Sequence, residues 1–141
     1  MAATTFDIEI ATPERLLSKV QAIRAQIPAK DGFIGVLPDH APLLSELGIG
    51  ALTYTTPDDH LFSLAINGGY LEINNNVVRI LGDIAEKSQE IDVSKAEKDL
   101  KQAQDAMVNP ALGMDIAAAL IAAQHAQARI DAARKAANNE E

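Results

Sequence analysis

Three histidines, His40, His60 and His125, are the side chains best suited to metal binding or acid–base chemistry, and the chain contains no cysteine. They lie in three separate segments, without the short spacings that place two ligands on one face of an element. The sequence also lacks a Gly-x-Ser-x-Gly nucleophile motif, and the pair Gly68-Gly69 lies between two strand-like runs, where it marks a sharp bend. We therefore predict a non-enzymatic protein without a metal centre.

His40 lies in a short segment that is bounded by two prolines. A proline fixes its own φ and favours extended geometry at the preceding residue, so Pro38 and Pro42 predict a rigid loop around His40. His40 either forms a hydrogen bond to nearby backbone or contacts a partner surface. The second role is favoured by a stiff loop, because such a loop loses little further conformational entropy on binding. The residues just before the loop, 32–37, predict a short buried strand that ends at Pro38.

The composition is that of a soluble globular protein. The chain has 141 residues, of which 48% are hydrophobic and 23% charged, enough for one domain or two small ones. It contains no apolar run of about 18 residues and no signal-peptide pattern, so we expect no direct membrane insertion. A net charge of −8 disfavours nucleic acid as a partner, and the absence of cysteine fits a reducing cytoplasm.

The first half of the chain has the pattern of β-strands separated by turns. Apolar and polar residues alternate over 5–10, and further strands are expected over 20–27, 51–54, 61–66, 70–73 and 77–81. The 61–66 strand is apolar on both faces, which is typical of a sandwich. Pro28 is expected to end a strand, Asn67-Gly68-Gly69 to break one, and Asn74-Asn75-Asn76 to form a tight hairpin turn. This half predicts a β-sandwich or a flattened barrel.

The second half has the pattern of two helices. Asp92 is expected to cap the first and Asp115 the second, with Asn109-Pro110 and Gly113 between them. The apolar face of the second helix consists mainly of alanine, which buries little area at roughly 25 cal/mol per Å². The helical pair is therefore either an element that rearranges or a permanently docked hairpin. We expect two domains, residues 1–87 and 88–141.

Three motifs in this order and spacing resemble the epsilon subunit of F-type ATP synthases: residues 35–44 (GVLPDHAPLL), residues 68–73 (GGYLEI) and residues 83–86 (DIAE). The resemblance implies a β + α fold, with an N-terminal β-sandwich of about ten strands followed by a C-terminal antiparallel two-helix hairpin. It also implies a non-catalytic rotor subunit of the central stalk. In that family the sandwich binds the gamma subunit and the membrane rotor ring, and the extended helices contact the alpha and beta subunits and inhibit ATP hydrolysis.

The resemblance implies two sets of contact residues. The rotor-ring and gamma interface comprises the loop of Gly32, Phe33 and Gly35 together with Asp39 and His40. The inhibitory contact comprises the basic residues Arg129, Arg134 and Lys135, which would meet acidic segments of the beta subunits. A solvated basic helix end, favourable with the helix dipole, is an equally simple interpretation of these three residues.

The resemblance also implies a nucleotide site, with two changes from the family pattern. Residues 91–96 are similar to the signature Ile/Leu-Asp-x-x-Arg-Ala, but Lys95 replaces its arginine and lacks the planar fork that grips phosphate. A further arginine expected on the second helix is His125. The expected site residues are Glu86, Ile91, Asp92, Lys95, Ala96 and Arg129. No cofactor is expected, and ATP is at most a weak regulatory ligand.

The resemblance places the protein at the periphery of a membrane, on the inner face of a bacterial plasma membrane or on the stromal side of a thylakoid. A second hypothesis is a non-enzymatic binding module, a sandwich with an appended hairpin, that serves another complex. Co-purification with a gamma subunit separates the two hypotheses.

Overall fold

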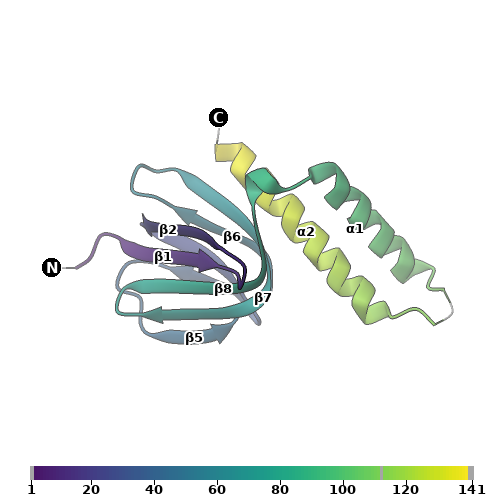
Figure 1. Cartoon of the computed structure of the whole chain (residues 1–141), viewed down its shortest axis with the longest axis horizontal. Coiled ribbons are helices and arrows are strands. Elements are labelled where there is room, and N and C mark those ends of the chain that lie inside the picture. The colour runs from purple at the N-terminus through teal and green to yellow at the C-terminus, as the bar shows by residue number, and fades with distance from the viewer. Residues whose placement is uncertain (1, 112, 140–141) are drawn as a thin grey trace.

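The computed structural model describes residues 2–111 and 113–139. Eight strands form one curled, sandwich-like sheet, and two antiparallel helices lie along one side of it (Figure 1). The strands are β1 (Phe6–Ala11), β2 (Leu16–Ala22), β3 (Arg24–Ala29), β4 (Gly32–Val36), β5 (Leu43–Glu46), β6 (Ile49–Thr55), β7 (Leu61–Asn74) and β8 (Val77–Lys87). A 3₁₀ turn, η1 (Ser88–Glu90), leads to α1 (Val93–Val108) and α2 (Ile116–Asn139). The predicted β + α fold is confirmed.

The sheet has the strand order β2-β1-β8-β7-β6-β3-β4, with β5 paired to β7 outside this path. The long strand β7 pairs with β6 along its first half and with β5 along its second half. It bends between the halves at Gly68 and Gly69, whose φ values are 73° and 120°. A Cβ on Gly69 would lie 2.0 Å from the carbonyl oxygen of Leu81, so only glycine fits this bend. The sharp bend predicted at Gly68-Gly69 is therefore confirmed, whereas the predicted break of the strand at Asn67-Gly68-Gly69 was wrong.

Two other expectations about the strands, that Pro28 ends a strand and that residues 20–27 form one strand, were wrong. Pro28 does not end a strand, because it lies inside β3 and pairs with Phe33 of β4. On the other side of β3, the pairing with β6 covers only Arg24 to Gln26 and ends before Pro28. Beyond the regular pairing with β6, the backbone N–H of Gly48 donates to the carbonyl oxygen of Pro28 at 2.9 Å, and a proline is tolerated because the regular ladder has ended. The strand before it begins at Leu16 and is separate from β3. The count is eight rather than about ten, because β7 and β8 are long and continuous.

The strand β4 is an exposed edge strand, not the buried strand that its apolar residues suggest. Val36 is buried, but Phe33 is 55% exposed. β4 ends the sheet and pairs only with β3, so much of it faces solvent. The predicted hairpin turn is confirmed, because Asn75 and Asn76 adopt φ values of 53° and 62° between β7 and β8.

The principal core lies entirely inside the sandwich. Its buried residues run from Phe6 to Ala85 and come from the strands and the segments between them. Leu64 and Ile66 of β7 point into this core, whereas Ala65 between them points to the other face. There it packs with Ala51 of β6 and with Ala128 and Ala132 of α2. The second apolar face of β7 is thus covered by a helix.

The hairpin begins and ends as the sequence predicts. The carboxylate of Asp92 accepts a hydrogen bond from the backbone N–H of Lys95 at 3.1 Å, and that of Asp115 accepts one from Ala118 at 3.2 Å. Small residues form the contact between the helices, including Ala96 and Ala103 on α1 and Ala123 and Ala126 on α2. The two helices therefore approach closely, and α2 fills the space between α1 and the sheet (Figure 1).

Candidate functional site

Four charged side chains from three elements meet where the hairpin joins the sandwich. Nε of Arg129 on α2 lies 2.9 Å from Oε1 of Glu86 on β8, and its Nη1 lies 3.8 Å from Oδ2 of Asp99 on α1. Asp99 also accepts a hydrogen bond from Nζ of Lys95 at 3.1 Å. We call Glu86, Lys95, Asp99 and Arg129 the junction cluster. Through it Arg129 ties the end of β8 to both helices.

The contact between Arg129 and Glu86 is close but only partly directed. Nε of Arg129 lies 2.9 Å from Oε1 of Glu86, but the two atoms are not aligned for a hydrogen bond. The directed bond runs from Nη2 to Oε2 of Glu86 at 3.3 Å. The side chains are only 12% and 26% exposed, so this pair is less screened than a surface pair. Removing either partner would leave the other charge in a poorly hydrated place.

His125 lies one turn before Arg129 and is half-buried beside the junction cluster. Its Nδ1 is buried without a hydrogen-bond partner. Burial is the largest influence and lowers the pKa of His125; Arg129 also lowers it, while Glu86 and Asp99 oppose the shift. The docked hairpin therefore favours the neutral imidazole.

The residues expected to bind a nucleotide fall into two groups. Glu86, Lys95 and Arg129 come together in the junction cluster. Asp92 caps α1, Ala96 is fully buried, and Ile91 packs against the alanine contact under α2. Asp99 completes the cluster but was not predicted as a site residue. Its position four residues after Lys95, on the same face of the helix, could have indicated that the two side chains interact.

The charges of the junction cluster balance. Two cations, Lys95 and Arg129, face two carboxylates, Glu86 and Asp99, and the neighbouring His125 favours its neutral form. A triphosphate would have to compete with both carboxylates for these cations. The cluster therefore acts as an internal clamp in the docked hairpin and is a poor phosphate site in this form.

Of the two loops that the resemblance implies at the rotor-ring interface, only the one with His40 is a loop in the structure. Gly32, Phe33 and Gly35 lie within β4, so the expectation of a loop there was wrong. Asp39 and His40 follow the strand and form a loop with a φ of 63° at Asp39. The side chain of Asn76 holds this loop by accepting a hydrogen bond from the Asp39 N–H at 2.8 Å. The imidazole Nδ1 of His40 lies 2.7 Å from the carbonyl oxygen of Ala41.

The His40 loop lies at the end of the sandwich remote from the hairpin. The backbone N–H of Ala3 donates to Oδ2 of Asp39 at 2.8 Å, which places the loop beside the N-terminus. The N-terminal strand starts on the side of the sandwich opposite to the helices (Figure 1). Phe33, by contrast, lies beside the end of α2, with Nζ of Lys135 6.0 Å from the centre of its ring. The two parts of the expected interface therefore face different neighbours.

The three basic residues of α2 differ in their surroundings. Arg129 is buried in the junction cluster, Lys135 approaches Phe33, and Arg134 is exposed. In the docked hairpin they do not form one basic surface. Arg134 and Lys135 lie outside the cluster and remain accessible.

An uncovered apolar surface, which was not predicted from the sequence, crosses the outer face of the sandwich. Leu16, Ala11, Leu81 and Tyr70 are successive cross-strand neighbours on β2, β1, β8 and β7, and Leu44 of β5 lies near them. Leu16, Leu44, Tyr70 and Leu81 are exposed, and together they border a groove of about 390 Å³. We call these four residues the outer stripe. No regular alternation in the sequence distinguishes such residues from core residues.

A row of ion pairs lies beside the outer stripe. Arg79 of β8 bonds to Glu9 of β1 at 3.1 Å and to Glu72 of β7 at 3.2 Å. An apolar centre with a charged border is the usual composition of a protein–protein interface.

Within residues 2–111 and 113–139, no cluster of three or more histidine, aspartate or glutamate side chains could hold a metal ion. No helix in the same part of the chain is both long enough and apolar enough to cross a membrane. A β-sandwich with a docked helical hairpin, a charge clamp between them and an uncovered apolar face defines the class of this protein.

Comparison with known proteins identifies the family. The family model for the ATP synthase delta/epsilon chain, beta-sandwich domain, matches residues 5–88. The ATP synthase epsilon chain of Solibacter usitatus is 46% identical over 131 residues, which cover 93% of this chain and 97% of that protein. The epsilon chain of Moorella thermoacetica is 37% identical over 129 residues, covering 92% and 96% of the two chains. The chain belongs to the ATP synthase delta/epsilon family.

The fold has a match among solved structures. A chain in the cryo-EM structure of the Euglena gracilis mitochondrial ATP synthase, OSCP/F1/c-ring in rotational state 1, aligns with a TM-score of 0.80 at 21% identity. The alignment covers 98% of this chain and 84% of that one, so both the sandwich and the hairpin are similar in fold.

Proposed function

We propose that this chain is the epsilon subunit in the central stalk of an F-type ATP synthase. In this role it is a non-catalytic subunit that connects gamma to the membrane rotor ring and slows ATP hydrolysis through its C-terminal helices. Family membership supports the role in the central stalk. The observation that carries the inhibitory role is the contact under α2, which consists of alanines and the junction cluster.

The hairpin acts as a removable brake. Ala51 and Ala65 meet Ala128 and Ala132, and such small side chains bury little apolar area, at roughly 25 cal/mol per Å². A docking free energy of a few kcal/mol can be overcome by a partner that binds the released form more tightly. The alpha and beta subunits of the catalytic head are that partner. Arg129, freed from Glu86, joins Arg134 and Lys135 in contacts with acidic segments of the head.

The outer stripe is the docking face for gamma. Its exposed leucines and Tyr70 form an apolar centre, and the ion pairs of Arg79 form a polar border. It lies on the sandwich and is not covered by α1 or α2 (Figure 1). Gamma therefore stays bound whether the hairpin is docked or extended.

The His40 loop is the contact with the rotor ring. It lies at the end of the sandwich remote from the hairpin and is held by Asn76 and by the N-terminal segment. Gly32, Phe33 and Gly35 belong to this interface only if it extends along β4. The protein sits at the periphery of the membrane, on the inner face of a bacterial plasma membrane.

ATP is at most a weak regulatory ligand. The cations of the junction cluster already face two carboxylates, and Lys95 offers no planar fork to a phosphate. Lys95→Arg should tighten whatever nucleotide binding exists.

Reconstitution of the catalytic head with gamma tests the proposal. ATP hydrolysis is measured with no addition, with the full chain and with residues 1–87. The full chain should lower the rate, whereas residues 1–87 should bind gamma and leave the rate unchanged. Arg134→Ala with Lys135→Ala should relieve part of the inhibition, and salt should weaken what these residues contribute.

Two results would contradict the proposal in different ways. Equal rates with the full chain and with residues 1–87 would exclude the brake and leave a structural coupling between gamma and the rotor ring. Failure to co-purify with gamma would favour a binding module of another complex. Leu44→Asp tests the docking face, since a charge on the outer stripe should weaken gamma binding without affecting the fold of the exposed site.

A further inference from the structure

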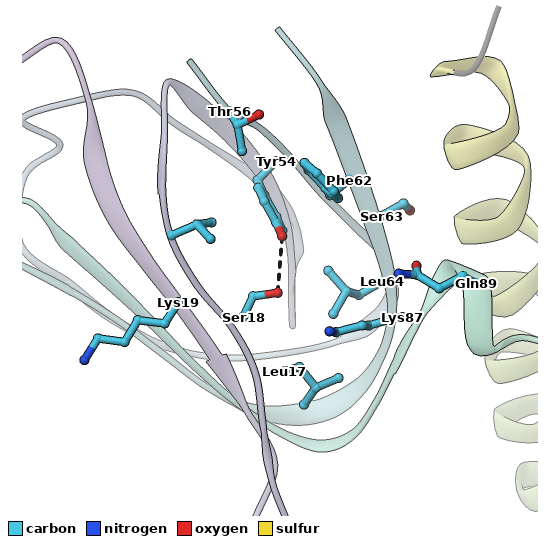
Figure 2. Close-up of a pocket in the computed structure, with 11 residues that line it drawn as sticks. Leu17, Ser18, Lys19, Tyr54, Thr56, Phe62, Ser63, Leu64, Lys87 and Gln89 are labelled. Atoms are coloured by element: carbon cyan, nitrogen blue, oxygen red, sulfur yellow. Dashed lines mark hydrogen bonds between the residues drawn. The ribbon is translucent and has the colours of Figure 1, made fainter. Parts of the chain in front are cut away.

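A groove of about 290 Å³ opens at one end of the sandwich, between β2 and the paired strands β6 and β7 (Figure 2). One wall is aromatic: Tyr54 and Phe62 stack with ring centres 5.2 Å apart and planes 18° from parallel. Tyr54 is 5% exposed, while Phe62 is 42% exposed and forms the outer part of the wall. The hydroxyl of Ser18 on β2 lies 3.2 Å from the hydroxyl of Tyr54, so these two side chains meet at one edge of the groove.

Lys87 places a cation on this inner face. Cross-strand register pairs Lys87 with Leu64, which points into the core, and pairs the preceding Glu86 with Ala65, which lies under α2. Successive strand residues point to opposite faces, so Glu86 and Lys87 face different surroundings. Figure 2 shows the ammonium of Lys87 directed into the groove, toward the side of Ser18. A lysine is unusual at a position that otherwise carries core residues.

No carboxylate lines the groove beside this cation. The adjacent Glu86 is bound to Arg129 on the opposite face. Glu90 is bound to Arg15 at 2.7 Å, and the charge of Lys87 also helps to lower the pKa of Glu90. Lys19 also borders the groove, but its side chain points away from it and pairs with Glu9 at 3.7 Å (Figure 2). Lys87 is therefore a half-buried ammonium that faces hydroxyl groups and an apolar wall, and the carboxylate near it, that of Glu90, is already held by Arg15.

We propose that this groove binds a small carboxylic acid with an apolar ring. The carboxylate meets Nζ of Lys87 and accepts a hydrogen bond from Ser18, whose oxygen in turn accepts the proton of Tyr54. The ring packs against Phe62, Tyr54 and Leu64. The groove lies at the lower limit of ligand pockets, which hold about 300–1,000 Å³, so it fits a single ring and excludes a nucleotide. The site is separate from the junction cluster and does not depend on the proposed function.

The composition of the chain allows a direct measurement. It has no tryptophan and two tyrosines, so Tyr70→Phe leaves Tyr54 as the only tyrosine and its fluorescence reports on the groove. Tyr70 lies on the outer stripe, away from the groove. The full-length Tyr70→Phe chain is titrated with cyclohexanecarboxylate, which does not absorb where tyrosine does. Cyclohexylmethanol provides the same ring without the charge, and acetate provides the charge without the ring.

We expect a saturable change in Tyr54 fluorescence with cyclohexanecarboxylate and at least about tenfold weaker binding of the alcohol and of acetate. Lys87→Met should weaken the acid about tenfold or more, whereas Lys87→Arg should keep most of the affinity. Lys19→Met is the matched control, because it removes a lysine at the same rim whose ammonium points elsewhere. Thermal unfolding shows whether Lys87→Met is folded. If it is not, Lys87→Arg, which retains the charge, still tests the site.

Equal affinity for acid and alcohol would overturn the proposal and leave a nonspecific apolar groove. Equal losses in Lys87→Met and Lys19→Met would also overturn it, since the effect would then reflect overall charge. Absence of saturation would show that a small acid is not the occupant. If only an acidic peptide saturated the signal, the groove would instead be a protein contact and the proposal would be wrong.

Discussion

Arg129 is the side chain that links the sandwich to both helices through charged contacts. It connects Glu86 of the sandwich with Asp99 of α1 while lying on α2 itself. The sequence predicted Glu86, Lys95 and Arg129 as site residues through the family resemblance, and they do meet. It did not predict Asp99 or the burial of His125, because helical periodicity shows which residues share a face and not which faces of two helices meet a sheet.

Arg129→Ala should loosen the docked hairpin. It removes one partner of a pair that is 12% and 26% exposed, so the cost should be about 1–3 kcal/mol, between the values for surface and buried pairs. Hydrogen exchange of the α2 amides should accelerate at least several-fold, while the strands keep their protection. Arg134→Ala, at an exposed position of the same helix, is the control. Unchanged α2 exchange in Arg129→Ala would show that the clamp contributes nothing.

Acid should weaken docking through His125. Burial lowers its pKa in the docked hairpin below the ordinary value of 6.5, with Arg129 acting in the same direction and Glu86 and Asp99 against it. When the hairpin is released, the imidazole of His125 is exposed to water and binds a proton more readily. The docked hairpin therefore has its full stability above about pH 6.5 and becomes less stable as the pH falls below this value. Protection factors of α2 amides at pH 7.5 and 5.5 measure this. His125→Gln should reduce the difference, and His60→Gln, at an exposed turn, should not.

At the scale of elements, the period of apolar residues predicted nearly every strand and both helices. Their ends were harder to predict. A glycine pair such as Gly68-Gly69 fits a break or a sharp bend equally well, and only the pairing of β7 with both β5 and β6 decides between them. In the same way, the two apolar faces of β7 correctly indicated that both sides are buried. They did not indicate that a helix covers one of these faces.

Filling the alanine contact should displace α2. Ala128 is buried against Ala51 and Ala65, so Ala128→Leu needs space that neither strand can provide. Overpacking of this kind costs about 1–3 kcal/mol. Trypsin should cleave after Arg129 and Arg134 several times faster in the variant, because both bonds lie in α2. Ala122→Leu places the same side chain on the exposed face and should cleave at the normal rate. If both variants resist trypsin equally, the alanine contact does not limit docking.

At the scale of the whole molecule, the two predicted domains remain a prediction. Every residue of the principal core lies between Phe6 and Ala85, so the sandwich contains the apolar residues that it needs. Residues 1–87 should unfold in one cooperative thermal transition. The helices contribute a separate contact through Ala128 and Ala132, whose loss should lower the melting temperature only modestly. A non-cooperative or absent transition would show that the hairpin is part of the folding unit.

The parallel pairing of β1 with β8 determines when the chain can fold. Residues 7–11 lie beside residues 77–81, and β8 fills the place between β1 and β7. A growing polypeptide therefore cannot complete its sheet until β8 has left the ribosome, and contacts over such long separations form slowly. The hairpin emerges after the sandwich, when Ala51, Ala65 and Glu86 are already in position to receive it. Synthesis itself thus delivers the sandwich first and the hairpin afterwards.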